Sequence, residues 1–257
     1  MNRSRGRYDW EVRYTDEQLQ LFFEQLERDG LLDNAIIAIV SDHGEDLFDH
    51  LELLTPKEQQ SRPLRRVFQM EHGRNMYPPL IGTPFILWGS GVSARVIDAP
   101  VENVDLYPTL MHLAGLRNPG KLHGRSLVPL LAGKADERAS VHSFVMQHTS
   151  LRETQTGLQI VLPSELGKRH GGVPALFDTA ADPEQRTNLY EKRPEDVARL
   201  SAAIEGWRAA HPTITTILKP RDPDTVRNMR ALGYFGEDEE EAAQLERDRR
   251  KKGRRDD

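Results

Sequence analysis

The stretch "AIIAIVSDHGED", residues 35–46, decides the fold class. Its first six residues are Ala, Ile or Val, and this apolar run ends abruptly at Ser41. An uninterrupted run of this kind is typical of a strand in a sheet covered on both faces. In open α/β sheets, ligands bind at the carboxyl ends of such strands, because the loops there converge without interrupting the sheet. Asp42 and His43, which follow at once, are therefore the first candidates for a functional site.

The segments around this strand indicate an α/β protein. Residues 9–29 predict an amphipathic helix that ends at Gly30, with an apolar stripe made of Val12, Leu19, Phe22, Phe23 and Leu26. A second apolar strand is predicted at "TPFILWG", residues 83–89. "VENVDLYPTLMHLAG", residues 101–115, predicts a short strand or loop followed by a helix that Gly115 closes. Alternation of helices and buried strands is the signature of this class.

The pattern changes near residue 141, where short β-like runs alternate with polar turns and predict a small antiparallel sheet. "RPEDVARLSAAIEGWRAAHP", residues 193–212, then predicts a helix. We therefore expect an α/β catalytic portion at 1–140 and a small α+β subdomain at 141–236. The charged segment 237–257 cannot bury an apolar face and is expected to be a disordered tail.

Composition excludes several classes of protein. The chain has 257 residues and a formal net charge of −5, so it lacks the basic field that binds nucleic acid. It has no cysteine, which removes disulfides, zinc–thiolate sites and thiol nucleophiles. No apolar run is long enough for a transmembrane helix, and "MNRSRGRYDW" lacks the apolar stretch of a secretory signal. These observations leave the localisation open.

Asp42 and His43 have two possible roles when "SDHGE" is considered alone. A carboxylate and a neutral imidazole side by side could both reach one divalent cation, with Gly44 permitting a tight exit from the strand. Equally, Asp42 could cap the following turn while His43 serves as an ordinary hydrogen-bonding residue. These five residues do not decide between a metal site and a structural turn.

Ordered motifs along most of the chain resemble the sulfatase family, within the alkaline phosphatase superfamily. Residues 8–46 resemble a helix leading into a strand that ends in the metal motif S-D-H/N-G, and "EHGRNMYPPLIGTPFILWGSGV" resembles the H/K-G-x-x-x-Y segment. "VENVDLYPTLMHLAGL" and "LHGRSLVPLLAGK" are similar to the V-D-x-x-P-T-L helix and the loop after it. "ALFDTAADPEQRTNLYEKRPE" and "VRNMRALGYFGE" resemble later segments. The order of these matches is more specific than any one of them.

The resemblance implies a fold and a reaction. The fold would be part of an alkaline-phosphatase-like sandwich, a mainly parallel sheet flanked by helices, with a small C-terminal antiparallel sheet plus helix. The reaction would be metal-assisted hydrolysis of a sulfuric ester. Calcium is the cation that the family favours, with manganese or zinc as alternatives. The substrate would be an anionic sulfate or phosphate ester, and many members of the family are extracytoplasmic.

The resemblance also assigns roles to individual residues. Asp42 and His43 would be two ligands of the divalent metal ion. His72 would bind the sulfuryl or phosphoryl oxygens and assist the leaving group, where negative charge grows in the transition state. His50 lies where many relatives have a histidine after the metal motif, and Glu45 could orient His43. Both are candidates for lining the site.

The family's nucleophile is missing from the expected place. Residues 61–65, Ser-Arg-Pro-Leu-Arg, satisfy the pattern S-x-P-x-R of the formylglycine precursor, but they follow the metal motif instead of preceding it. We therefore assign no nucleophile. The interpretation is a C-terminal portion of a sulfatase-like enzyme, truncated, inactive by itself and completed by a missing N-terminal half.

Two other interpretations stay open at this point. A phosphodiesterase or phosphoethanolamine-transferase relative would also use D-H-G and the later H-G, with Thr or Ser as the nucleophile. A non-catalytic remnant would instead bind an anion or a partner chain through the surface that the missing half covers in relatives.

Overall fold

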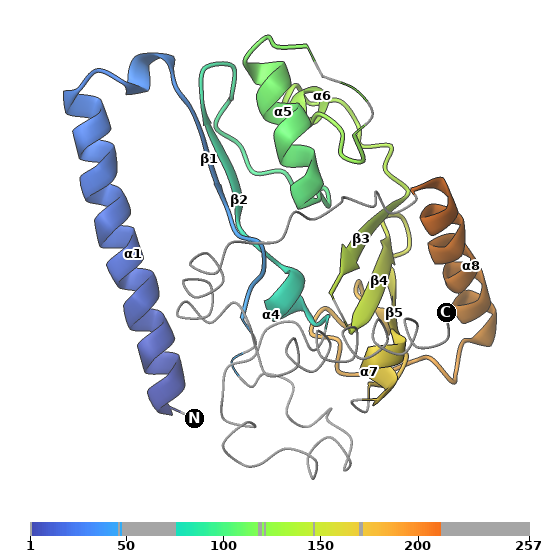
Figure 1. Ribbon diagram of the computed structural model, residues 1–257. Helices are drawn as coiled ribbons and strands as arrows, with labels where there is room; N and C mark the ends of the chain where they lie inside the picture. Colours follow the sequence, from blue (N-terminus) through green and yellow to red (C-terminus); the bar gives the residue numbers. More distant parts are fainter. Residues whose placement is uncertain are drawn as a thin grey trace, which may run out of the picture. The chain divides into compact units, whose positions relative to one another are not determined.

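The computed structural model describes residues 2–45, 47, 76–117, 120, 122–145, 147–169 and 172–211 (Figure 1). Some sequence predictions lie outside these residues: His50, His72, the S-x-P-x-R match at 61–65 and the charged tail at 237–257. The predicted domain boundaries at 140 and 236 stay predictions. Among the described residues, no helix has both the length and the apolar character needed to cross a membrane.

The chain begins with helix α1, Asn2–Arg28, which is longer than the predicted helix at 9–29. Its end is a Schellman motif: the N–H of Leu31 donates to the carbonyl of Leu26, and the N–H of Gly30 donates to that of Glu27. Gly30 has φ +68°, a left-handed conformation that glycine adopts without steric cost. The predicted apolar stripe is only partly buried, because Phe22 remains 55% exposed.

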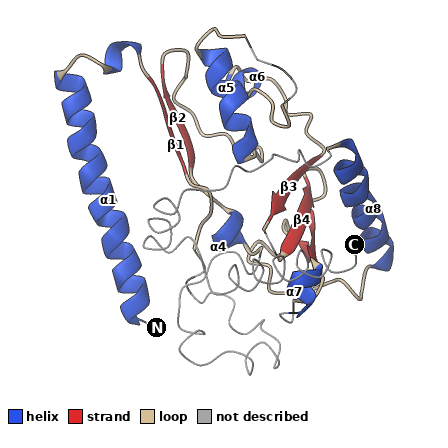
Figure 2. Ribbon diagram, in the orientation of Figure 1, coloured by secondary structure: helices blue, strands red, loops and turns tan. Residues whose placement is uncertain are grey.

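Strands β1, Ile36–Val40, and β2, Phe85–Gly89, form a two-stranded sheet. They pair in the antiparallel direction, with Ile36 opposite Gly89 and Val40 opposite Phe85. The mainly parallel sheet expected from the sequence is therefore not confirmed, because every described strand pair is antiparallel (Figure 2). A continuous apolar run predicts a strand that needs covering on both faces, but it carries no information on the direction of its neighbour.

Several short helices lie between β1 and β3 along the chain. Helix α4, Pro78–Ile81, precedes β2, while the 3₁₀ helix η3, Asn103–Asp105, leads directly into α5, Leu106–Leu113. Helix α6, Val128–Leu131, follows. The helix predicted within residues 101–115 is confirmed at α5.

The predicted C-terminal antiparallel sheet is confirmed. It has four strands in the order β3-β4-β5-β6, namely Ser140–Phe144, His148–Glu153, Leu158–Pro163 and Ala175–Asp178. Helix α7, Glu165–Arg169, lies between β5 and β6, and α8, Pro194–Ala210, follows β6. One core cluster joins the sheet to α8 through Leu151, Leu158, Ile160, Leu176, Leu200 and Ile204. This cluster is the best-buried apolar core in the described part of the chain.

A second cluster ties the segment before α4 to the same sheet. Met76 packs with Val161, Ala175 and Phe177, and its side chain is buried. Gln159 donates from Nε2 to the Met76 carbonyl at 3.3 Å, so a polar contact accompanies the apolar one. The chain just before α4 is thereby fixed to the C-terminal sheet.

Aromatic stacking joins α8 to strand β3. Trp207 lies 4.7 Å from the ring of His142 and 5.0 Å from that of Phe144, and both rings are nearly parallel to it. The ring of His211 lies 4.5 Å from Trp207 at an interplanar angle of 17°. Stacking of this kind adds to the stability that burial alone supplies.

Candidate metal centre at the end of strand β1

Asp42 and His43 occupy a tight turn directly after β1. The Ser41 hydroxyl donates to the carbonyl of His43 at 2.6 Å, and the N–H of His43 donates to Asp42 Oδ1 at 3.0 Å. Both bonds are formed within the turn itself. The bond to Asp42 comes from the residue directly after it, whereas a capping side chain accepts from the N–H two or three residues further on, so the capping role of Asp42 stays a prediction.

The two side chains lie close enough to share one cation. His43 Nε2 is 3.8 Å from Asp42 Oδ1, and the side chains are 42% and 83% exposed, respectively. Metal ions lie about 2.0–2.6 Å from nitrogen and oxygen ligands, so both atoms can contact a single ion. His43 Nδ1 lies 2.8 Å from the carbonyl of Gly44; a proton on Nδ1 that binds this carbonyl places the ring's lone pair on Nε2, facing Asp42.

By themselves the two side chains would fill only part of a coordination shell. Among the residues that the structure describes, no group of three or more His, Cys, Asp or Glu is arranged to hold a metal ion. Glu45, two residues after His43, is partly buried. A cation at this turn would thus take two ligands from Asp42 and His43 and its others from elsewhere.

Two other segments fix the backbone of the turn. Gly44 lies so close to α4 that a Cβ atom built on it would be 2.0 Å from the carbonyl oxygen of Pro79. The N–H of Gly44 donates to the carbonyl of Leu80 at 2.7 Å. On the other side, the Asn103 amide donates from Nδ2 to the carbonyl of Ser41, also at 2.7 Å. Only glycine fits at position 44, for reasons of space.

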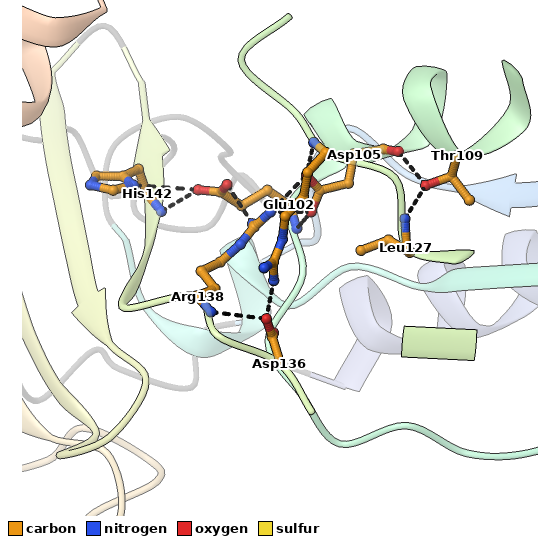
Figure 3. A network of polar contacts seen from close by, with 8 residues as sticks. Glu102, Asp105, Thr109, Leu127, Asp136, Arg138 and His142 are labelled. Atoms are coloured by element: carbon orange, nitrogen blue, oxygen red, sulfur yellow. Dashed lines mark hydrogen bonds and ion pairs between the residues drawn. The ribbon is translucent and has the colours of Figure 1, made fainter. Parts of the chain in front are cut away.

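Near η3 lies a charged network that the sequence did not reveal (Figure 3). We call it the Arg138 network; its members are Glu102, Asp105, Arg125, Asp136 and Arg138. Arg138 donates from Nη2 to both carboxylate oxygens of Asp105 at 2.7 Å and from Nη1 to Glu102 Oε2 at 2.5 Å. Asp105 is fully buried. Nη2 is thus shared between the two oxygens of Asp105, and charge-assisted contacts of this kind are stronger than hydrogen bonds between neutral groups.

Backbone groups complete this network. The Asp105 carboxylate accepts from the backbone N–H groups of Glu102 and Arg125. The Asp136 carboxylate accepts from the backbone N–H of Arg138 and from the guanidinium of Arg125. The N–H of His142 donates to Glu102 Oε1 at 2.6 Å. The carboxylates of Glu102 and Asp105 are thereby paired several times over, as buried charges require, whereas Asp136 uses Oδ1 alone and its buried Oδ2 has no hydrogen-bond partner among the described residues.

The network lowers the pKa of two of its carboxyl groups, those of Glu102 and Asp136. Burial disfavours the charged form of Glu102, but hydrogen bonds from His142 and the positive charge of Arg138 outweigh burial and lower its pKa below the ordinary 4.5. Burial likewise opposes ionisation of Asp136, yet hydrogen bonds from Arg138 and Arg125 lower the pKa of that carboxyl. These groups are engaged with one another, which indicates a structural role.

Sequence reasoning could have found one part of this network. Glu102 and Asp105 form a reciprocal capping box on η3, and a pair of acidic residues at this spacing around a helix start is a recognisable signal. Thr109 is buried, and its hydroxyl donates to the Asp105 carbonyl and accepts from the N–H of Leu127. The partner Arg138 is 33 residues from Asp105 and has no local signal.

Comparison with protein families identifies a match over the first part of the chain. Residues 1–116 match the family model described as Sulfatase. Among curated relatives, arylsulfatase K of Gallus gallus is 29% identical over 204 residues, 74% of this chain and 34% of the relative. The Xenopus laevis protein is 26% identical over 186 residues, 68% of this chain and 31% of the relative. The chain thus spans about a third of the length of the curated relatives it matches.

Solved structures share the fold. One is a protein in complex with its substrate D-glucosamine-2-N,6-O-disulfate, with a TM-score of 0.58 and 22% identity over 77% of this chain and 39% of that one. Another is a phosphonate monoester hydrolase from Silicibacter pomeroyi, with a TM-score of 0.57 and 21% identity over 81% of this chain and 41% of that one. At these identities the likeness establishes the architecture alone. The family-model match over residues 1–116, the curated arylsulfatases and these structures all support the resemblance of the chain to the sulfatase family.

Proposed function

We propose that this chain contributes the Asp42–His43 pair of a divalent metal site to the hydrolysis of a sulfuric ester. By family, the chain is a sulfatase-like hydrolase. The observation that carries the finer proposal is the 3.8 Å separation of His43 Nε2 and Asp42 Oδ1 at the carboxyl end of β1. A carboxylate oxygen and an imidazole nitrogen at this separation can both bind the same divalent cation.

Each residue has a defined part in this proposal. Asp42 brings negative charge and His43 brings a neutral nitrogen ligand, and a bound divalent ion would polarise the ester oxygens. His72, which lies outside the described residues, is proposed to bind the oxygens of the substrate and assist the leaving group, as the resemblance implies. His50, also outside them, and Glu45 remain candidates for lining the site.

The ligand types leave more than one cation in play. Carboxylate oxygen suits calcium, which the family resemblance favours. An imidazole ligand shifts the preference toward manganese or zinc. We propose calcium first and test the other two beside it.

We further propose that the rest of a sulfatase domain completes the site, whether it belongs to the same polypeptide or to another. The chain matches about a third of the length of each of these curated relatives, and no nucleophile is assigned to it. One face of the two-stranded sheet is also apolar and incompletely covered. Ile37 and Ile39 lie opposite Trp88 and Ile86 on it, and these last two are 49% and 53% exposed. Apolar faces of this kind are normally buried against further structure.

Thermal unfolding of the 257-residue chain with Ca²⁺, Mn²⁺ or Zn²⁺ tests the metal proposal. A cation at 100 times its dissociation constant should stabilise the fold by about 2.7 kcal/mol, and Asp42→Ala should abolish the effect. Asp33→Ala is the matched control, because it removes an exposed carboxylate at the opposite end of β1. Equal stabilisation of the Asp42→Ala variant and the unaltered chain would refute the site.

Hydrolysis of an aryl sulfate tests the need for further structure. With the stabilising cation present, the 257-residue chain should release no sulfate above background, because no nucleophile is assigned to it. Release that is lost in Asp42→Ala would show that the chain is active by itself and overturn this part of the proposal.

A further inference from the structure

We propose that Asn103 is a positioning residue for the Asp42–His43 pair; this inference rests on the proposed metal site. Its side-chain amide donates from Nδ2 to the carbonyl of Ser41 at 2.7 Å, across 62 residues of sequence. Ser41 is the residue between the end of β1 and Asp42. The bond therefore fixes the orientation of the peptide group between Ser41 and Asp42, directly before the proposed ligands.

Asn103 can act in this way because its own backbone is anchored. Asn103 is the first residue of η3. It lies between Glu102 and Asp105, the two acidic residues of the capping box. Arg138 binds both of those carboxylates, and Asp105 is fully buried. A side chain on a turn anchored at both ends has little freedom to follow a moving partner. The Arg138 network thus transmits its rigidity to the Ser41 carbonyl.

The other end of the ligand turn is held as well. The N–H of Gly44 donates to the carbonyl of Leu80, and the carbonyl of Pro79 leaves no room for a side chain at position 44. The turn is consequently fixed by Asn103 before the ligands and by α4 after them. Holding ligand atoms in place before the ion arrives removes an entropic cost of binding.

Asn103→Leu is the direct test, since it keeps the size of the side chain and removes its donor. The expected result is a threefold to tenfold faster amide hydrogen exchange at His43 and Gly44, and a similar rise in the Mn²⁺ dissociation constant, as loss of about one hydrogen bond implies. Val104→Leu is the matched control, because it places a leucine on the same turn at an exposed position and leaves the bond intact.

Further measurements separate positioning from general instability. Exchange at the core amides of Ile160 and Leu176 should stay unchanged in Asn103→Leu, because these residues belong to the C-terminal core. Asn103→Asp should also accelerate amide exchange at His43 and Gly44. Only exchange is measured in this variant, because the added negative charge would itself attract the cation. Unchanged exchange at both amides in both variants would overturn the inference, as would acceleration that the core shares equally.

The same experiment distinguishes this inference from the proposed function. If the unaltered chain binds no Mn²⁺, Ca²⁺ or Zn²⁺, the metal proposal fails, while exchange at His43 and Gly44 still shows whether Asn103 fixes the turn. If the cation binds but the dissociation constant is the same in Asn103→Leu and Val104→Leu, the metal site stands and the positioning role is overturned.

Discussion

The ligand turn and the Arg138 network both combine carboxylates with nitrogen donors, but they differ in how completely those groups are used. The Asp42 side chain is 83% exposed and accepts one backbone bond in its turn. Asp105 is buried and accepts from Arg138, from the N–H of Glu102 and from that of Arg125. The Asp42 carboxylate is therefore open to an additional ligand, whereas the Asp105 carboxylate is engaged by the protein.

This difference separates a functional site from a structural one. A buried carboxylate that already has its donors would lose them on binding a cation, which is costly. An exposed carboxylate with one backbone hydrogen bond, such as Asp42, exchanges mainly water for the cation. Substitutions in the two regions should consequently affect different quantities: stability in the network and ligand binding in the turn.

The largest effect is expected from Arg138→Met. It removes the guanidinium that binds two carboxylates and leaves the buried Asp105 without its cationic partner, so we expect a loss of about 3–5 kcal/mol in the free energy of unfolding. Urea denaturation measures this. Arg13→Met, which removes an exposed i,i+4 partner of Glu17, is the control and should cost about 0.5 kcal/mol. A loss as small as that of the control would show that the network is dispensable.

Gly44→Ala should have the next largest effect. The added Cβ would meet the carbonyl of Pro79, and relief of that overlap should cost about 1–3 kcal/mol in urea denaturation and weaken cation binding. Gly206→Ala, in α8 with no atom within 4 Å of the added Cβ, is the matched control and should stabilise the protein by about 0.5–1 kcal/mol. Wild-type stability and cation binding in Gly44→Ala would contradict the tight fit at α4.

Glu102→Gln should reveal the pH dependence of the network. The folded-state pKa of Glu102 lies below its ordinary value of 4.5, so its contribution is fully present above that value and is lost as the pH falls through the folded pKa. Glu102→Gln should lower the free energy of unfolding by about 1 kcal/mol at pH 7 and flatten its decline below pH 4.5. An equally steep decline in both proteins would show that Glu102 does not titrate in this way.

The smallest effect is expected from Asp42→Asn without added metal. Because the side chain is exposed, urea denaturation should give a free energy of unfolding within about 0.5 kcal/mol of the unaltered chain. The stabilisation produced by the cation should nevertheless fall sharply. A large loss of stability in metal-free protein would indicate that Asp42 serves the fold, as in the network.

Local patterns in the sequence predicted much of the fold. The strand at β1, the end of the first helix at Gly30 and the helix α8 were all identified from periodicity and capping residues. The direction of β2 relative to β1 was not, because an apolar run is the same in either orientation. The predicted stripe on α1 was found, but the exposure of Phe22 depends on structure that the residues of the helix do not encode.

The candidate site was predictable only where its members are neighbours in sequence. Asp42 and His43 are adjacent, so their proximity followed from the chain itself. The bond from Asn103 to Ser41 spans 62 residues, and Arg138 lies 36 residues from Glu102. Such contacts between distant residues arise from the tertiary fold, and no local sequence pattern predicts them. His72 remains a prediction.

The stacking around Trp207 gives the protein a built-in optical reporter. Of its three tryptophans, Trp10 and Trp88 are 64% and 49% exposed, whereas the Trp207 indole is stacked with His142 and His211. Replacing the two exposed tryptophans with phenylalanine would leave an emission signal from Trp207 alone. Fluorescence would then follow the separation of α8 from β3 during unfolding without any attached dye.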